Sequence, residues 1–282
     1  MDKEKIHDNI DRKVREVLGI TLDEYLSLEP QEQQKLIKTN ILKQQEIAYI
    51  SNQREIKNET ETVTNQEYDL PVIGNNRLIV IDAGHQAHGN SEQEPIGPGA
   101  SETKAKVTTG ATGVSTGKLE SLINLEVALK LQQKLEMSGY QVKMIRTSQD
   151  VNISNRERAM VANDSNCAAF IRLHCNSADS SSASGTLTIA PSTNNPYCSQ
   201  IAEASYNLSK CVVDNICSQT GSKNRGVMIN DTMSGINWCK VPVTIVEMGF
   251  LSNYEEDRLL SDSSYQDKIV NGIVKGINEY ME

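Results

Sequence analysis

Three short aliphatic runs in this chain each lead to a side chain that can bind a metal ion or carry a proton. The runs cover residues 79–82, 170–173 and 243–246, and the side chains that follow them are His85, His174 and Glu247. Buried strands of an α/β sheet read as nearly unbroken runs of this kind, and their ligand-binding groups lie beyond the carboxyl ends. The three side chains are therefore expected to meet at one edge of a sheet.

The chemistry of these side chains fits a hydrolytic zinc site. A catalytic zinc ion needs three protein ligands, commonly His and Glu, and an open position for water. A further carboxylate must accept a proton from that water and pass it to the leaving amine. Glu120, in the first turn of an expected helix, adds a second glutamate to the set. Two histidines and two glutamates meet the requirement.

The pattern beyond Pro71 alternates between strands and helices. It predicts an α/β three-layer sandwich, in which a mixed central sheet is flanked by helices. Strands are expected over 78–82, 142–145, 168–174, 185–190 and 241–248, and helices over 119–137, 154–161, 198–220 and 265–280, with a short helix after Ser252. The intervening segment 86–118, rich in Gly, Ser and Thr, is expected to be a long loop. It is either a lid on the substrate side or a surface insertion.

The amino-terminal quarter has a different composition. Residues 1–70 are expected to be a helical, polar arm with a linker, and residues 71–282 the catalytic domain. Apolar residues recur at Ile6, Ile10, Val14 and Leu18, and residues 21–24 form a capping-box pattern that opens a second helix. Residues 51–68 read as the linker. The arm either packs on the catalytic domain or a partner protein, or is a solvated extension.

Several further segments occur in a characteristic order along the chain. They are residues 80–85, 120–125, 139–142 with Arg146 and Thr147, Arg158 with Ala162 and Asn163, 174–177, and 241–253. In these segments, from about Arg77 to Tyr280, the chain resembles the zinc-dependent N-acetylmuramoyl-L-alanine amidases of the third amidase family. Two departures stand out. Gln86 follows the first histidine where many relatives have glycine. Two positions before the second histidine, where relatives usually have a small residue, this chain has Arg172.

The resemblance implies a phosphorylase/hydrolase-like fold and assigns roles to the four side chains. His85, Glu120 and His174 would hold one Zn²⁺ ion, and Glu247 would be the general acid/base. The implied reaction cleaves the amide between N-acetylmuramic acid and L-alanine in peptidoglycan, as in an autolysin or endolysin. Further candidates for substrate contact are Asn176, Arg172 and His88.

Other interpretations remain open from the residues alone. The metal site is also compatible with a zinc carboxypeptidase or aminoacylase, and a silent wall-binding module is a third possibility. Glu247 could instead be one half of a structural ion pair with Arg172. Three other glutamates compete with Glu120 as ligand: Glu94, Glu102 and Glu126. Cys175 follows His174 directly, so it should point to the opposite face of the strand and not share the metal.

Charge and composition exclude some classes of function. The net charge is −9, and no basic stripe offsets it, so nucleic acid is not an expected partner. Residues 1–7 lack the apolar region of an export signal, and no apolar run reaches membrane-spanning length. The chain is therefore expected to be made in the cytoplasm with reduced cysteines and to reach the wall after release. If an export segment lies outside this sequence, it is instead secreted.

Overall fold

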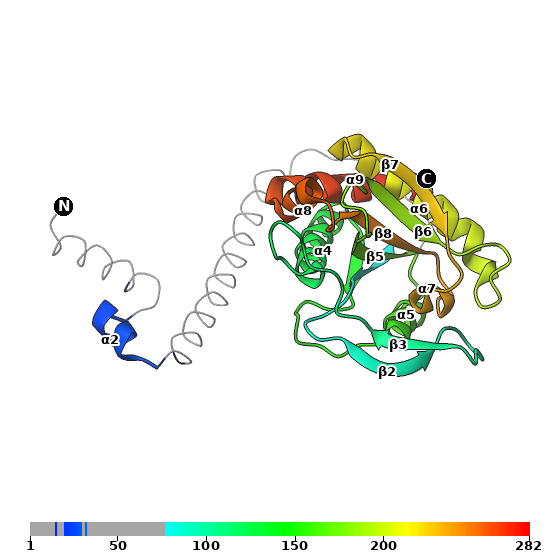
Figure 1. The fold of residues 1–282 in the computed structure, drawn as a ribbon. Coiled ribbons are helices and arrows are strands. Elements are labelled where there is room, and N and C mark those ends of the chain that lie inside the picture. Colours follow the sequence, from blue (N-terminus) through cyan, green and yellow to red (C-terminus); the bar gives the residue numbers. More distant parts are fainter. Residues whose placement is uncertain (1–14, 16–19, 30–31, 33–76) are drawn as a thin grey trace. The chain divides into compact units, whose positions relative to one another are not determined.

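The computed structural model describes residues 15, 20–29, 32 and 77–282 (Figure 1). The chain divides into two units, Met1–Pro71 and Val72–Glu282. In the first unit the helix α2 (Leu22–Ser27) is opened by the predicted capping box. The Glu24 N–H donates to Thr21 Oγ1 at 3.0 Å, and the Thr21 N–H donates to Glu24 Oε2 at 2.8 Å. The predicted apolar stripe over residues 6–18 and the predicted linker 51–68 lie outside the described residues.

A six-stranded mixed sheet forms the centre of the second unit. Its strands are β1 (Leu78–Ala83), β4 (Gln141–Met144), β5 (Ala169–Asn176), β6 (Thr186–Ala190), β7 (Asn224–Ile229) and β8 (Val243–Phe250). The strand order is β4-β1-β5-β8-β6-β7. The first four strands in this order are parallel, and β6 runs antiparallel to β8. The carboxyl ends of β1, β5 and β8 therefore lie side by side, as the sequence predicted.

Helices cover both faces of this sheet (Figure 1). One face packs against α4 (Glu120–Met137), α6 (Ala202–Thr220) and α9 (Ser263–Met281), and the other packs against α5 (Asn155–Asp164) and α7 (Ser234–Asn237). The short helices η1 (Ser199–Ile201) and α8 (Tyr254–Ser261) complete the unit. Alternate residues of β5 divide between the two cores, with Ile171 and Leu173 on the α4 side and Phe170 on the α5 side. The predicted three-layer α/β sandwich is confirmed.

The two helix N-termini that were predicted at Ser154 and after Ser252 both carry side-chain caps. Ser154 Oγ accepts the Glu157 N–H at 3.1 Å, and Glu157 Oε2 accepts the Ser154 N–H at 2.7 Å, which is a complete capping box. Asn253 caps α8 by accepting the N–H groups of Glu255 and Glu256. These caps satisfy donors that a helix leaves unpaired in its first turn.

The segment predicted as a long loop contains an antiparallel hairpin, which the sequence analysis did not anticipate. Its strands are β2 (Asn90–Pro95) and β3 (Thr103–Val107). Both strands are largely polar and exposed, so they lack the alternating apolar pattern that marks a strand. Contacts with the α5 and α7 region hold the hairpin instead: Trp238 Nε1 donates to the Pro95 carbonyl at 2.8 Å, and the Arg156 N–H donates to Glu94 Oε1 at 3.0 Å.

None of the described helices combines the length and the apolar character that crossing a membrane would need.

Helices α6 and α9 pack closely because two glycines of α9 face the backbone of α6. A Cβ atom added at Gly276 would lie 2.6 Å from Val212 Cα, and one added at Gly272 would lie 2.5 Å from Ile216 Cα. Both Cα atoms belong to the backbone, which cannot move aside as a flexible side chain can. These two positions therefore set the distance between the helices.

Replacing Gly276 with Ala should destabilise the protein despite the better helix propensity of alanine. The added methyl group meets the α6 backbone, and such overpacking costs about 1–3 kcal/mol. Urea denaturation of the variant measures this loss. The neighbouring exposed Lys275 provides the control, since Lys275→Ala should change the free energy of unfolding by less than about 0.5 kcal/mol. Equal stability of the two variants would contradict the close packing.

Candidate metal centre

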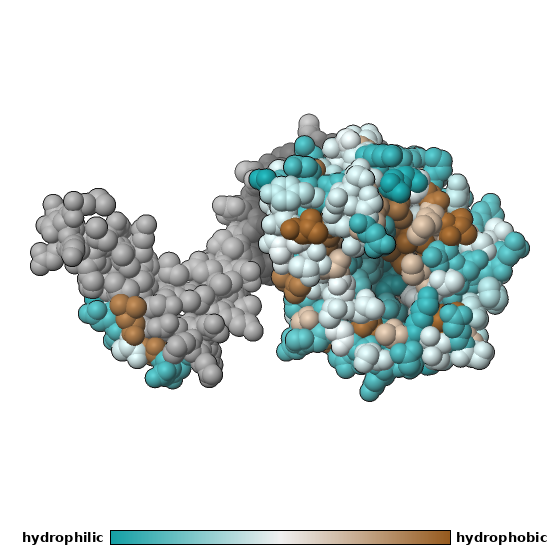
Figure 2. All heavy atoms as spheres, in the orientation of Figure 1, coloured by the Kyte–Doolittle hydropathy of each residue, from teal (hydrophilic) through white to brown (hydrophobic). Residues whose placement is uncertain are grey.

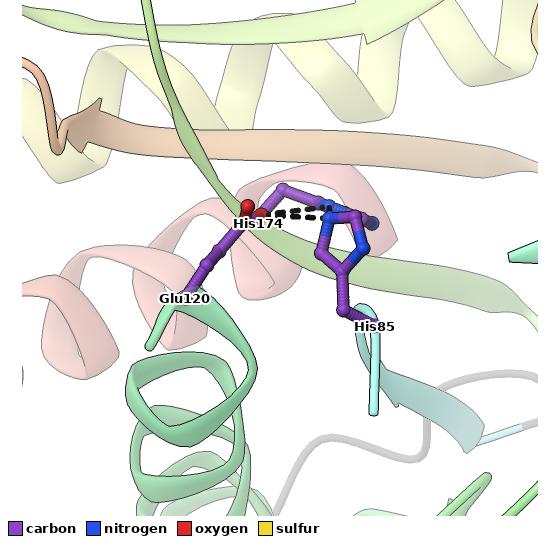
Figure 3. Close-up of side chains that lie close together, drawn as sticks. All are labelled: His85, Glu120 and His174. Carbon is purple, nitrogen blue, oxygen red and sulfur yellow. Dashed lines mark hydrogen bonds and ion pairs between the residues drawn. The ribbon is translucent and has the colours of Figure 1, made fainter. Parts of the chain in front are cut away.

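His85, Glu120 and His174 converge from three elements of the second unit. Figure 3 shows their side chains pointing toward one another from the end of β1, the first turn of α4 and the end of β5. Glu120 Oε1 lies 3.0 Å from His85 Nε2 and 3.1 Å from His174 Nδ1. The two ring nitrogens are 3.2 Å apart. One ligand atom from each residue lies within 4.8 Å of the others, so the donor set fits a divalent metal ion.

The His85 ring is oriented by the chain that follows the hairpin. His85 Nδ1 lies 2.9 Å from the Thr108 carbonyl oxygen, which can only accept, so Nδ1 carries the proton. Its Nε2 faces Glu120 Oε1 and His174 Nδ1. Metal-bound histidines commonly make such an outer hydrogen bond, because it fixes both the tautomer and the ring plane. His85 also has a φ of 61°, a conformation that is uncommon for a residue with a side chain.

Glu120 is nearly buried and fully hydrogen bonded. Its Oε1 accepts the Cys175 N–H at 3.1 Å, and its Oε2 accepts the Ala111 N–H at 2.8 Å. Burial alone would raise the pKa of Glu120, but hydrogen bonds with His174 and His85 outweigh it and hold that pKa well below its usual value. The carboxyl group is therefore an anion, which is the form that binds a metal.

The competing glutamates have other partners. Glu126 pairs with Lys118 at 2.6 Å, and Glu94 accepts the Arg156 N–H. Neither of these, nor Glu102, belongs to the converging group. Cys175 is buried with its Sγ 3.6 Å from Asn124 Oδ1 and is likewise outside it. The alternation along β5 explains this, because adjacent residues face opposite sides of the sheet.

A buried ion cluster supports the turn that carries His85. Asp82 receives Arg158 Nη1 at 2.6 Å and Arg172 Nε at 2.9 Å. Arg158 Nη2 also donates to the His85 carbonyl at 3.1 Å. Burial alone would raise the pKa of Asp82, but the two guanidinium groups hold it well below its usual value. Arg146 adds bonds to the Ala83 and Gly84 carbonyls at 2.7 and 3.0 Å.

These supporting roles were not predicted from the sequence. Asp82, Arg146 and Arg158 do lie in the segments that carry the family resemblance, so their spacing was a usable signal. No sequence signal pointed to the Thr108 carbonyl, because its role depends on where a loop returns to the sheet.

Glu247 lies beside the converging residues, on β8. In the parallel pairing of β5 and β8 it is the register partner of His174. Its Oε2 is enclosed and has no hydrogen-bond partner among the described residues. Burial, and then the negative charge of Glu120, raise the pKa of Glu247 to about 8. The alternative ion pair with Arg172 is absent from the described contacts, since Arg172 binds Asp82 and Asn155 instead.

His85, His174 and Glu247 line one pocket of about 470 Å³. Figure 2 shows this face of the unit hollowed, with hydrophilic residues inside and hydrophobic residues on parts of the rim. Arg172 also lines this pocket. His88 is exposed and lines a separate, shallow depression with Gln86, and Asn176 lines neither. Of the three predicted substrate contacts, the structure thus brings Arg172 alone to the converging residues.

Comparison with known proteins agrees with this arrangement. Residues 79–279 match the family model described as N-acetylmuramoyl-L-alanine amidase. The chain is 28% identical to the N-acetylmuramoyl-L-alanine amidase LytC of Bacillus subtilis (strain 168) over 210 residues, which cover 74% of this chain and 36% of LytC. It is 30% identical to the uncharacterized protein YqiI of the same strain over 212 residues, which cover 75% of this chain and 87% of YqiI.

A solved structure shares the fold. The crystal structure of the N-acetylmuramyl-L-alanine amidase Ami1 from Mycobacterium smegmatis superposes with a TM-score of 0.66, and the match covers 72% of this chain and 96% of Ami1. The sequences are 21% identical, so this likeness concerns the fold alone. The chain spans about a third of the length of LytC, so LytC has regions without a counterpart here.

The raised pKa of Glu247 predicts a pH-dependent stability of the metal-free protein. The folded state holds this proton up to about pH 8, whereas the unfolded state releases it near 4.5. Stability should therefore fall as the pH rises from 4.5 to 8, relative to Glu247→Gln, which cannot ionise. The difference should reach a few kcal/mol, since one pKa unit corresponds to about 1.4 kcal/mol.

Urea denaturation of both proteins in the presence of a chelator, at several pH values, measures this difference. Parallel stability profiles for wild type and Glu247→Gln would mean that the carboxyl group is not held in a desolvated pocket.

Proposed function

The chain belongs to the N-acetylmuramoyl-L-alanine amidase family, and on that premise we propose that it hydrolyses the amide between N-acetylmuramic acid and L-alanine in peptidoglycan. The observation that carries this proposal is the convergence of two imidazoles and one carboxylate, with both imidazoles lining a pocket that they share with Glu247, whose Oε2 has no hydrogen-bond partner among the described residues. The cell wall is the proposed site of action, because peptidoglycan is the substrate.

The converging residues are the proposed metal ligands. His85, Glu120 and His174 hold one zinc ion in this proposal, and their nitrogen and oxygen donors suit that metal. A bound zinc ion supplies a Lewis acid for the amide carbonyl and a water whose pKa is lowered to about 7. The hydrogen bonds from His85 to Thr108 and from the Ala111 N–H to Glu120 fix the two ligands before any metal binds.

Glu247 is the proposed general acid/base. It accepts a proton from the attacking water and returns it to the alanine nitrogen, which then leaves as an amine. A group whose pKa lies near neutral pH can perform both transfers. The enclosed, unpartnered Oε2 and the raised pKa support this role.

The remaining predicted residues and the domain boundary are part of the same proposal. Arg172 is a proposed substrate contact because it lines the pocket. His88 and Asn176 are proposed to contact only the parts of the substrate that extend beyond the pocket. Residues 71–282 are the proposed catalytic domain, and residues 1–70 are an appendage to it.

Metal content and digestion of purified sacculi test the assignment together. The zinc-loaded wild type should release intact stem peptides with L-alanine at the amino terminus, a product that a carboxypeptidase does not form. Glu247→Ala should keep about one zinc ion per chain and lose roughly 10²–10⁴-fold in turnover, as expected for a general base. His174→Ala should lose the zinc as well.

Glu255→Ala is a matched control, because Glu255 is exposed on α8 and away from the pocket. It should retain both zinc and activity. Loss of zinc in Glu247→Ala would make Glu247 a ligand and overturn the assignment of roles. A wild type that binds zinc and leaves sacculi intact would reject the amidase proposal.

Deletion of residues 1–68 tests the boundary. The shortened protein should cleave soluble peptidoglycan fragments at the wild-type rate, because every residue assigned to the chemistry lies beyond Arg77. Rates are compared by chromatography of the released peptides, with circular dichroism to confirm folding. A folded but inactive deletion protein would show that the arm contributes to the site.

A further inference from the structure

One wall of the pocket is built from cationic side chains. Lys104 from β3 and Arg172 from β5 line it, together with Asn155, Thr232 and Gly235. Among the described residues, Glu247 is the sole carboxylate that lines this pocket. We call the part of the lining that carries Lys104 and Arg172 the cationic wall.

Arg172 is held so that one nitrogen is left for a ligand. The residue is 2% exposed. Its Nε donates to Asp82 and its Nη2 donates to Asn155 Oδ1 at 2.8 Å. No hydrogen bond joins Nη1 to another residue in the described part of the chain. A Cβ atom at position 235 would collide with Nη1, so glycine at this position makes room for that nitrogen beside the pocket.

The positive charge behind this wall is only partly neutralised. Asp82 is the one carboxylate that Arg158 and Arg172 share, and both pairs are buried. Arg146 lies in the same cluster, where burial and then the charge of Arg158 lower its pKa to about 10. Two guanidinium groups therefore share one carboxylate, while that of Arg146 binds backbone carbonyls, and a buried excess of positive charge favours an anionic ligand.

Lys104 adds a second cation without an acidic partner. Its Nζ donates to the neutral Thr232 carbonyl at 2.8 Å, and it forms no ion pair among the described residues. Lys106 on the same strand differs, since it pairs with Glu92 at 2.6 Å and does not line the pocket. The charge of Lys104 is therefore available to a bound molecule.

We infer that the wall formed by Lys104 and Arg172 binds a stem-peptide carboxylate and selects stems whose second residue is D-glutamate over those in which it is D-isoglutamine. This inference rests on the proposed function. The α-carboxylate of the second residue lies about 7 Å from the bond that precedes the first, since an extended residue spans about 3.5 Å. Amidation replaces this anion with a neutral group and removes the charge-assisted hydrogen bonds.

Two soluble substrates that differ in this group alone test the inference. They are N-acetylmuramoyl-L-alanyl-γ-D-glutamyl-L-lysine and its D-isoglutaminyl counterpart. The wild type should cleave the acid with a kcat/KM at least about tenfold higher, since hydrogen bonds to charged groups contribute about 1.5–3 kcal/mol. Lys104→Met should lower that ratio about fivefold or more, mainly through a higher KM for the acid. Lys106→Met, the matched control, should keep the wild-type ratio.

The outcomes separate this inference from the proposed function. Equal kcat/KM for the two substrates in the wild type, or an unchanged ratio in Lys104→Met, would overturn the inference while leaving the amidase proposal standing. If the zinc-loaded wild type cleaves neither substrate, the amidase proposal fails. In that case the Kd of each substrate is measured by calorimetry for the wild type and both lysine variants. The acid should bind more tightly than the amide to the wild type and to Lys106→Met, and Lys104→Met should lose this preference; any other result would overturn the inference.

Discussion

The buried carboxylate of Asp82, shared by Arg158 and Arg172, is the interaction on which the site depends. Each of these charges is stable in the interior only because the others are present. Breaking a buried pair by removing one partner typically costs about 3–5 kcal/mol. The same cluster fixes the backbone, since Arg158 binds the His85 carbonyl and Arg146 binds the carbonyls just before it. The turn that carries the first proposed metal ligand is therefore locked to the sheet by the ion cluster.

The segment that connects the hairpin to α4 also supports the proposed metal ligands. Residues of this connection bind two of the proposed ligands, through the Thr108 carbonyl and the Ala111 N–H. Further along, the buried Asp257 of α8 accepts the N–H groups of Ser115 and Thr116, both at 2.7 Å. The segment is thus anchored at several points. It is an ordered part of the site, and this explains how a Gly- and Thr-rich stretch can hold the proposed metal ligands within narrow limits.

The pocket combines two opposite electrostatic environments. Near the proposed metal ligands, Glu247 is desolvated and faces the negative charge of Glu120, so its proton is held more tightly than usual. Lys104 and Arg172 line the same pocket. A substrate with a neutral amide at the reacting position and an anion further along would match both environments. Arg172 thereby belongs to two systems, since the buried cluster that positions His85 also supplies charge to the pocket.

The amino-acid sequence determined the layers, the strand ends that carry His85, His174 and Glu247, and the starts of the helices at Ser154 and after Ser252. These features rest on patterns between near neighbours in the chain, which hydrophobic periodicity and capping rules encode. The tertiary structure alone decided that the segment after His85 forms a hairpin, that Arg172 pairs with Asp82, and that the Thr108 carbonyl orients a ligand. Polar strands and hydrogen-bond partners far apart in sequence leave no local pattern. Their positions are fixed only when packing brings distant segments together.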